Sequence, residues 1–358
     1  MENRNFALPE DMVPSLLRWY DKSARTLPWR SDPSPYRVWV SEIMLQQTRV
    51  AAVIERFETF LRELPDLEAL AAAGEGELMK LWEGLGYYSR ARNMQKAARS
   101  IMERCEGRFP SAFEEILRLP GVGEYTAGAV SSIAFGLPVP AVDGNVLRVV
   151  SRLTASDTDI GRPEVKKSVG DAIRKIIPHS RPGDFNQALM DLGAEICLPN
   201  GAPLCSRCPL SSFCEGYRRG VAESLPVKTA KKPRRRECRT VFLVFSPLGV
   251  ALRRRPDRGL LAGLWEFPGE NGFLSAEEAV PVLQSWGLNV RNAVSSVKGF
   301  HVFTHVEWDM TGIMADAAPN ELPACWRWAD ARALREELAV PSAFRAYLEE
   351  ALRHMEGA

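Results

Sequence analysis

Apolar side chains in the first 220 residues recur at helical spacing. One set lies three and four residues apart and so shares a helix face: Val53, Ile54, Phe57, Phe60, Leu61 and Leu64. The same spacing predicts helices over residues 67–82, 91–105, 112–117, 125–135, 142–153 and 164–177. Proline and glycine separate these stretches. The pattern predicts an all-helical domain over residues 1–220.

The pattern changes toward the C-terminus. Two β-rich segments, 241–245 and 250–254, flank the turn residues Ser246-Pro-Leu-Gly249, which predicts a hairpin. Aromatic, strand-like segments follow at 298–310 and 326–328, and a helix is predicted over 331–353. We therefore expect an α+β domain over 238–358. A basic, proline-interrupted stretch over 221–237 indicates an exposed linker between the two domains.

Composition fits two ordinary globular domains. The chain has 358 residues, of which 46% are hydrophobic and 25% charged, so global disorder is excluded. The formal net charge is only +1, but six basic side chains fall between Lys228 and Arg236. The N-terminus lacks the order of a signal peptide, and no stretch approaches the ~20 apolar residues of a membrane helix. We expect a cytoplasmic protein without a membrane partner.

Four of the seven cysteines are crowded into one short segment: Cys197, Cys205, Cys208 and Cys214. This distribution indicates a metal site rather than a secreted disulfide framework. One C-x-x-C pair flanked by two single cysteines favours a 4Fe–4S cluster, with structural zinc as the alternative. Cys105, Cys238 and Cys325 lack such neighbours and are expected to be buried apolar side chains.

A glycine-rich turn precedes one predicted helix. In Leu119-Pro-Gly-Val-Gly123 the glycines permit a tight turn, and the free N–H groups of the following helix can bind a phosphate oxygen. An ordinary helix–helix turn explains this motif equally well. Downstream, Val142-Asp-Gly-Asn145 puts a carboxylate and an amide at the start of another helix. Asp143 taken alone is explained by simple N-capping.

An acidic residue interrupts an apolar helical segment near the N-terminus. Glu42 lies within Trp39-Val-Ser-Glu-Ile-Met-Leu-Gln-Gln-Thr48, where burial would raise its pKa and keep it protonated near neutral pH. The alternative is a surface glutamate on an amphipathic helix. The two glutamines and the threonine suit a surface that reads base edges.

Together these motifs resemble a known enzyme family. WVSEIMLQQT, LWEGLGYYSRARN, LPGVGEYTAGA, VDGNVLRV and the four-cysteine loop resemble the helix-hairpin-helix glycosylases of the endonuclease III superfamily, and within it the MutY-type adenine DNA glycosylases. GLLAGLWEFPG and HVFTH resemble that group's C-terminal domain, so the likeness extends over nearly the whole chain. The resemblance implies base-excision repair by a monomeric enzyme that acts on double-stranded DNA with adenine opposite 8-oxoguanine or guanine. It also implies a 4Fe–4S cofactor.

The resemblance assigns the catalytic roles. Glu42 matches the glutamate that protonates adenine at N7, and Asp143 matches the aspartate that stabilises the positive sugar. Asn145 matches an amide that positions water or Asp143, and Tyr125 matches a tyrosine beside the sugar. Strand-cleaving relatives carry lysine where this chain has Tyr125, and some carry it at Leu147. The resemblance therefore implies a monofunctional glycosylase.

The resemblance also assigns DNA contacts. Gln47 and Tyr87 match residues that enter the base stack, Thr48 lies near the opposite base, and Arg30 lines the adenine pocket. The N–H groups at Gly121 and Gly123 are expected at a phosphate. Phe303, Thr304 and His305 match the segment that reads 8-oxoguanine.

Two positions depart from the family pattern. The family has six residues between the first two cluster cysteines where this chain has seven, and we expect a bulged loop that keeps the cluster. Thr304 replaces the family's serine but retains the hydroxyl, so we expect recognition to survive.

The C-terminal domain resembles the Nudix fold without its hydrolytic site. When R-E-x-x-E-E-x-G is aligned on Gly287, its metal-binding glutamates become Pro281, Gln284 and Ser285. This domain is therefore expected to bind rather than catalyse. Two other functions remain open at this point: a pyrimidine-damage glycosylase with lyase activity, and a non-catalytic iron–sulfur DNA-binding protein.

Overall fold

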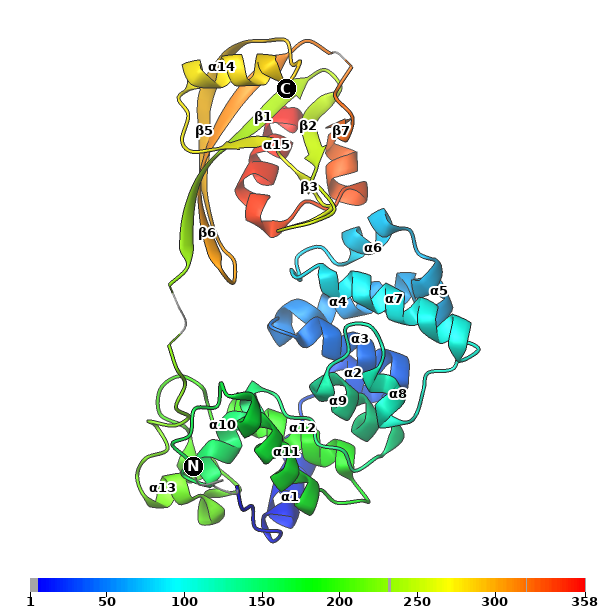
Figure 1. The fold of residues 1–358 in the computed structure, drawn as a ribbon, viewed down its shortest axis with the longest axis vertical. Coiled ribbons are helices and arrows are strands. Elements are labelled where there is room, and N and C mark those ends of the chain that lie inside the picture. The colour runs from blue at the N-terminus through cyan, green and yellow to red at the C-terminus, as the bar shows by residue number, and fades with distance from the viewer. Residues whose placement is uncertain (1–5, 231–232, 320, 358) are drawn as a thin grey trace. The chain divides into compact units, whose positions relative to one another are not determined.

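A computed structural model of the protein describes residues 6–230, 233–319 and 321–357. The chain divides into two compact units (Figure 1). The first comprises residues 1–72 and 93–230, and the second comprises 73–92 and 231–358. The second unit therefore takes in a short stretch of the N-terminal half of the chain.

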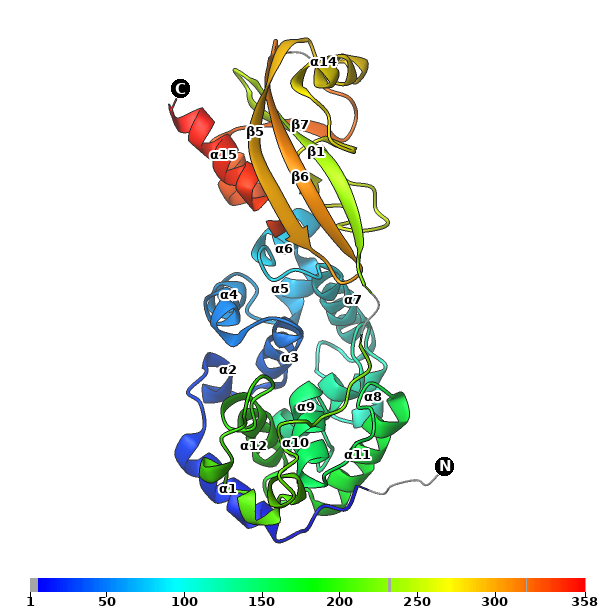
Figure 2. The same cartoon turned by 90° about the vertical axis from the view of Figure 1, so that its left-hand side faces the viewer.

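The first unit is all-helical, as the sequence predicts. Its helices, seen in Figures 1 and 2, are α1 (Met12–Ser23), α2 (Pro28–Ser31), α3 (Pro35–Leu45), α4 (Val50–Glu63), α5 (Leu67–Ala72), most of α7 (Ser89–Arg104), α8 (Phe113–Leu117), α9 (Glu124–Phe135), α10 (Gly144–Leu153), α11 (Pro163–Ile176), α12 (Pro182–Glu195) and α13 (Glu215–Arg218). Short 3-10 turns at Cys205–Arg207 and Ser211–Phe213 complete it.

Amphipathic helices build the core of this unit. In α4 the inward residues are Val53, Phe57 and Phe60, which the helical spacing predicts. A second core forms where α1, α10, α11 and α12 meet around Val150, Phe185 and Leu189. Between α10 and α12 the backbones approach so closely that a Cβ on Gly193 would lie 2.6 Å from the Cβ of Asn145. Glycine at this position brings α12 next to the start of α10.

One predicted helix is two helices in the structure. Residues 67–82 form α5 and, beyond a break at Ala73 and Gly74, α6 (Glu75–Leu81), which belongs to the second unit. Gly74 takes the extended conformation of an N-cap, φ −66° and ψ 147°, and so ends the continuity that the apolar spacing suggested.

The second unit contains a mixed seven-stranded sheet. Its strands are β1 (Arg235–Ser246), β2 (Gly249–Arg254), β3 (Trp265–Glu266), β4 (Gly269–Asn271), β5 (Val290–Val302), β6 (Val306–Ala317) and β7 (Trp326–Ala329). The main order is β3-β2-β1-β6-β5, with β1 and β6 parallel, β4 beside β1 and β7 beside β2. The predicted hairpin is confirmed, because β1 and β2 pair as Phe245 with Val250 and Ser246 with Gly249.

Helices pack on both faces of this sheet. Alternate residues of β1 point to opposite sides: Leu243 and Phe245 contribute to the core with Leu334 and Phe344, whereas Phe242 and Val244 pack against α14 (Ala276–Ser285). The first of these faces is closed by α15 (Arg345–Gly357), and Figure 2 shows α14 and α15 at different sides of the sheet. This unit has the predicted α+β character.

Three details of the C-terminal prediction are wrong. Residues 298–310 are not one strand: they end β5 and start β6, with a turn at 303–305 between them. The helix predicted over 331–353 is interrupted, since Pro341 cannot continue it, and only α15 is a regular helix. Cys238 and Cys325 are exposed rather than buried.

The predicted linker is shorter than its composition suggests. Residues up to Thr229 pack on the first unit, where Arg152 donates to the carbonyl of Leu225 and Ile160 donates to that of Val227. At the other end, β1 already begins at Arg235, which pairs with Val306. Lys231 and Lys232 lie outside the described residues. Backbone pairing thus takes up much of a segment that charge and proline content assign to a linker.

Candidate active site

Glu42 is buried in the first unit. It lies in α3 between fully or nearly fully buried apolar side chains, Trp39, Ile43 and Met44, and only 6% of its surface is exposed. Its Oε2 accepts a 2.6 Å hydrogen bond from the Tyr125 hydroxyl on α9. Burial raises the pKa of Glu42 to about 7, the charge of Asp143 adds to the rise, and Tyr125 and Arg30 oppose it. The carboxyl group can therefore hold a proton near neutral pH.

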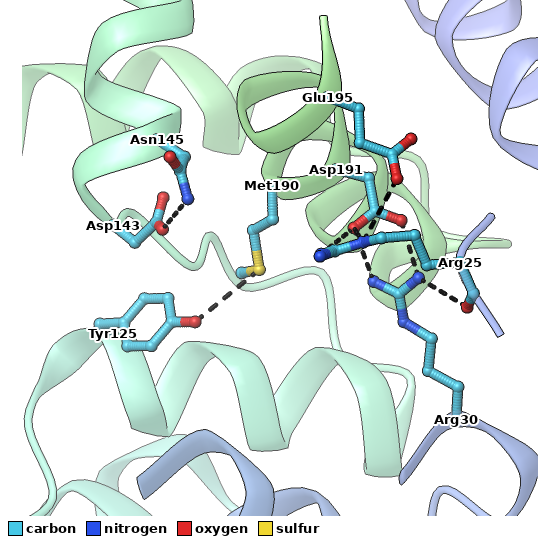
Figure 3. A network of polar contacts seen from close by, with 8 residues as sticks. All are labelled: Arg25, Arg30, Tyr125, Asp143, Asn145, Met190, Asp191 and Glu195. Carbon is cyan, nitrogen blue, oxygen red and sulfur yellow. Dashed lines mark hydrogen bonds and ion pairs between the residues drawn. The ribbon is translucent and has the colours of Figure 1, made fainter. Parts of the chain in front are cut away.

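Asp143 is the N-cap of α10. Its Oδ1 accepts from the backbone N–H of Val146 at 2.8 Å. Its Oδ2 accepts from the side-chain amide of Asn145 at 3.0 Å, the contact drawn in Figure 3. Burial raises the pKa of Asp143, whereas these hydrogen bonds and the charge of Arg148 favour its ionised form. Capping and a site role are therefore compatible, because the cap leaves the carboxylate facing a cavity.

One cavity of about 590 Å³ collects most of the predicted site. It is lined by eight of the residues singled out in the sequence: Arg30, Glu42, Gln47, Thr48, Gly123, Tyr125, Asp143 and Asn145. Gly121 does not line it. That residue adopts φ +78° in the turn before α9, and a Cβ there would lie 2.6 Å from the Cβ of Asn93, so the turn requires glycine.

Sequence reasoning missed an ion-pair cluster at the edge of this cavity. Asp191 on α12 is fully buried and contacts the guanidinium groups of Arg25 and Arg30 (Figure 3). Met190, the preceding residue, lies with its Sδ 3.7 Å from the Tyr125 hydroxyl. The available signal was an acid within the apolar segment Ala188-Leu-Met-Asp-Leu192, the same pattern that drew attention to Glu42.

The remaining predicted DNA contacts line a different cavity, in the second unit. Tyr87, Phe303, Thr304 and His305 surround a space of about 930 Å³. The hydroxyl groups of Tyr87 and Thr304 are 3.0 Å apart, within hydrogen-bond distance. Tyr87 is 46% exposed and has a positive φ of 45°. The turn that places Phe303 and Thr304 here is the hairpin turn that the sequence pattern missed.

The four clustered cysteines line one small cavity in the first unit. None of the described residues forms a preassembled group of three or more metal ligands. The donor set nonetheless fits an iron–sulfur cluster, because four thiols surround one space and Arg152 donates to the Sγ of Cys197 at 3.2 Å. Burial raises the pKa of Cys208 to about 12, and a bound metal would favour the ionised form of that thiol.

Hydrogen bonds connect the cysteine loop to Asn145. Arg148 donates to the carbonyl of Cys197 at 2.8 Å, to the carbonyl of Gly193 at 2.7 Å, and to the Asn145 side-chain oxygen at 2.8 Å. The loop that carries the cysteines therefore helps to hold the amide that contacts Asp143.

Two domain families match the chain in the order that the fold shows. Residues 40–175 match the HhH-GPD superfamily of base excision DNA repair proteins, and residues 240–350 match the NUDIX domain. The match over 40–175 includes Glu42, Tyr125 and Asp143. Fold and site together define a base-excision DNA glycosylase.

Comparison with whole proteins narrows this class. The chain is 37% identical to the adenine DNA glycosylase of Mus musculus, over 88% of this chain and 73% of the relative. The protein belongs to the adenine DNA glycosylase family, enzymes of base-excision repair that hydrolyse N-glycosyl bonds. The family resemblance seen in the sequence is confirmed.

Solved structures support the same superfamily. A thermostable thymine-DNA glycosylase is 30% identical, with a TM-score of 0.53, over 59% of this chain and 96% of that one. A trapped endonuclease III–DNA covalent intermediate is 25% identical, with a TM-score of 0.51, over 60% and 99%. The endonuclease III superfamily binds damaged DNA and commonly carries a 4Fe–4S cluster. None of the described helices is both long and apolar enough to cross a membrane.

Proposed function

We propose that this protein removes adenine opposite 8-oxoguanine or guanine in double-stranded DNA, by hydrolysis and without strand cleavage. The observation that carries the proposal is Glu42, a buried carboxyl group with a pKa of about 7, in one cavity with a second carboxyl group, Asp143. Glycoside cleavage needs such a pair, one acid to protonate the leaving group and one carboxylate to stabilise the positive sugar.

Glu42 is the general acid in this mechanism. Adenine leaves more readily once N7 is protonated, and Glu42 supplies that proton. The Tyr125 hydroxyl holds the carboxyl group in one orientation, at 2.6 Å. Burial favours the protonated form of this acid, since only 6% of the residue is exposed. The ionised form then assists the attacking water.

Asp143 stabilises the sugar cation. Its carboxylate is held by Asn145 and by the N-terminus of α10, so little reorganisation is needed when positive charge develops. Asn145 is itself fixed by Arg148 at 2.8 Å. The amide therefore orients the carboxylate.

The side chains at two positions favour hydrolysis over strand cleavage. A lyase reaction needs an amine that forms an imine with the opened sugar. This chain has Tyr125 and Leu147 at the two positions where relatives carry lysine. Lys166 also lines the cavity and is the amine that the Lys166→Ala variant tests.

The opposite base is read by the second unit. Thr304 and Tyr87 bring two hydroxyl groups together beside Phe303 and His305. Hydroxyl groups can hydrogen-bond the oxidised base, and the aromatic side chains can stack on it. Gln47 and Thr48 in the first unit, with the amides at Gly121 and Gly123, complete the DNA contacts.

Four cysteines hold a 4Fe–4S cluster in this proposal: Cys197, Cys205, Cys208 and Cys214. The cluster orders the loop around it, and no step of base release passes through it. Iron and sulfide analysis of the purified protein should give four of each per chain. A protein that contains only zinc would contradict this assignment.

The product assay tests the proposed reaction. A duplex with one adenine opposite 8-oxoguanine is incubated with the protein, and the strands are analysed before and after treatment with heat and alkali. We expect the protein to release free adenine. Strand breaks should appear only after the treatment with heat and alkali. Breaks before treatment, with a borohydride-trapped adduct, would identify a lyase, and their loss in Lys166→Ala would assign the amine.

A further inference from the structure

Asp191 holds two arginines at the edge of the cavity that contains Glu42, called the adenine cavity here. Its side chain is 0% exposed, whereas those of Arg25 and Arg30 are 26% and 15% exposed. Arg30 binds it with both terminal nitrogens, Nη1 to Oδ2 at 2.7 Å and Nη2 to Oδ1 at 3.0 Å. Arg25 donates to Oδ1 through Nε at 2.8 Å (Figure 3).

The side chains of Arg25, Arg30 and Asp191, called the trio below, come from distant parts of the chain. Arg25 precedes α2, Arg30 lies in α2, and Asp191 lies in α12. Nη1 of Arg30 also donates to the backbone carbonyl of Arg25 at 3.2 Å. A bidentate contact with a carboxylate fixes the plane of a guanidinium group as well as its position. Asp191 therefore determines where both arginines lie.

This arrangement is linked to Glu42 by charge. Burial alone would raise the pKa of Asp191, but Arg30 and Arg25 outweigh it and hold the carboxyl group ionised. The three side chains thus carry two positive charges and one negative charge, and the partly exposed Glu195 lies 3.8 Å from Nε of Arg25. Arg30 in turn lowers the pKa of Glu42. Without the negative charge of Asp191, the positive charges of Arg25 and Arg30 would be less compensated and would lower the pKa of Glu42 further.

We propose that Asp191 is a positioning residue of the glycosylase site: it places Arg25 and Arg30 at the adenine cavity and neutralises enough of their charge for Glu42 to stay protonated. This inference rests on the proposed role of Glu42. A purely structural ion pair would stabilise the fold, but it would have no specific effect on the proton affinity of Glu42.

Other charged groups surround Glu42. The charged and titratable side chains that line its cavity from the neighbouring elements are Arg25, Arg30, Glu124, Tyr125, Asp143 and Lys166. Of these six side chains, only Arg30 is replaced in the variants that test this proposal. A shift in the titration of Glu42 can therefore be traced to the trio.

The test is the pH dependence of adenine release in Asp191→Asn, measured under single-turnover conditions on the A:8-oxoguanine duplex. Asparagine keeps the size and removes the charge. We expect the alkaline limb of the profile to move to lower pH by about one unit. The rate then falls about tenfold at pH 8 and changes much less at pH 5.5. An equal loss at every pH would overturn the electrostatic part of the proposal.

A double variant traces the effect to Arg30. Adding Arg30→Met to Asp191→Asn removes the uncompensated charge, so the alkaline limb should return toward its original pH even though the rate stays low. A limb that remains shifted would contradict the proposal. The matched control is Asp21→Asn, which breaks the exposed ion pair with Arg181 and should leave the profile unchanged.

Asp191→Glu keeps the test valid if the asparagine variant does not fold. Glutamate retains the charge but moves it, so the rate should fall at all pH values with the limb unmoved. Carbon-13 NMR of the Glu42 carboxyl group, assigned with Glu42→Gln, measures its titration without any turnover. If Glu42 titrates at the same pH in Asp191→Asn as in the unmodified protein, the inference about Asp191 is refuted but the proposed function is not. Full activity of Glu42→Gln would instead refute the role of Glu42 as the general acid.

Discussion

The cavity around Glu42 and the cavity around Thr304 differ first in the side chains that form them. In the helical unit the buried carboxyl group of Glu42 and the half-buried carboxyl group of Asp143 face one space. In the second unit the cavity around Thr304 is lined, among the described residues, by one carboxyl group, that of Glu237. This group accepts a hydrogen bond from the Trp308 ring N–H at 2.9 Å and forms an ion pair with Arg235. Arg239 stacks on the Trp308 ring, 4.2 Å from its centroid.

This difference separates two tasks. Proton transfer needs a desolvated acid whose pKa is close to the working pH, which the first cavity provides in Glu42. In the proposed function, base recognition uses hydroxyl, aromatic and cationic groups that bind without reacting, and the second cavity contains such groups in Thr304, Phe303 and Arg239. We therefore expect substitutions in the two cavities to separate catalysis from discrimination.

The largest effect is expected for Glu42→Gln. The amide keeps the size of the side chain but cannot donate the proton, and general acid catalysis contributes ~10²–10⁴-fold. Single-turnover adenine release should fall by at least that range, with duplex affinity retained in a gel-shift assay. Turnover within tenfold of the unmodified protein would remove Glu42 from the mechanism.

The same substitution should stabilise the fold at alkaline pH. A carboxyl group whose pKa rises from 4.5 to about 7 on folding favours the native state below its unfolded pKa, and that contribution is lost as pH rises to 7. Above pH 8, Glu42→Gln should raise the free energy of unfolding by about 3 kcal/mol, measured by urea denaturation. The gain should vanish at pH 4. Glu55→Gln on the exposed side of α4 is the control.

A smaller effect is expected from Thr304→Val, which removes one hydroxyl group and keeps the shape. A single hydrogen bond contributes ~0.5–1.5 kcal/mol, which corresponds to about 2- to 13-fold. The preference for A:8-oxoguanine over A:G should fall by that factor. Thr304→Ser is the matched control and should retain the preference. If valine preserves it too, another group reads the lesion.

The smallest effect is expected from Tyr125→Phe. The Tyr125 hydrogen bond lowers the pKa of Glu42, so its removal raises that pKa. The alkaline limb of the rate profile should move to higher pH, the opposite direction to Asp191→Asn, with a severalfold change in rate at most. A shift to lower pH would show that the hydroxyl group favours the protonated acid.

The sequence motifs predicted a set of site residues, and the structure places most of them around one cavity. Glu42 and Tyr125 lie in α3 and α9, and Asp143 caps α10. Their roles were assigned through the family resemblance of the short motifs that contain them. Asp191 was missed because its importance depends on Arg25 and Arg30, more than 160 positions away in the chain. Helical periodicity cannot report a contact between two helices that far apart.

The turn at Phe303–His305 was missed for a related reason. Residues 298–310 are rich in aromatic and β-branched side chains, with no glycine or proline at the turn itself. Only the pairing of β5 with β6, as in His301 with Trp308, shows that the chain reverses there. Long-range pairing also explains why β1 extends into the predicted linker, since Arg235 pairs with Val306.

The most direct test of this division of labour measures two quantities on the same two variants, Glu42→Gln and Thr304→Val. One quantity is the single-turnover rate on A:8-oxoguanine duplex, and the other is the ratio of Kd values for A:G and A:8-oxoguanine duplexes. We predict that Glu42→Gln loses rate at least 10²-fold with its Kd ratio unchanged. Thr304→Val should lose about 2- to 13-fold of the ratio, with a nearly normal rate at saturation. Loss of both quantities in either variant would contradict the account.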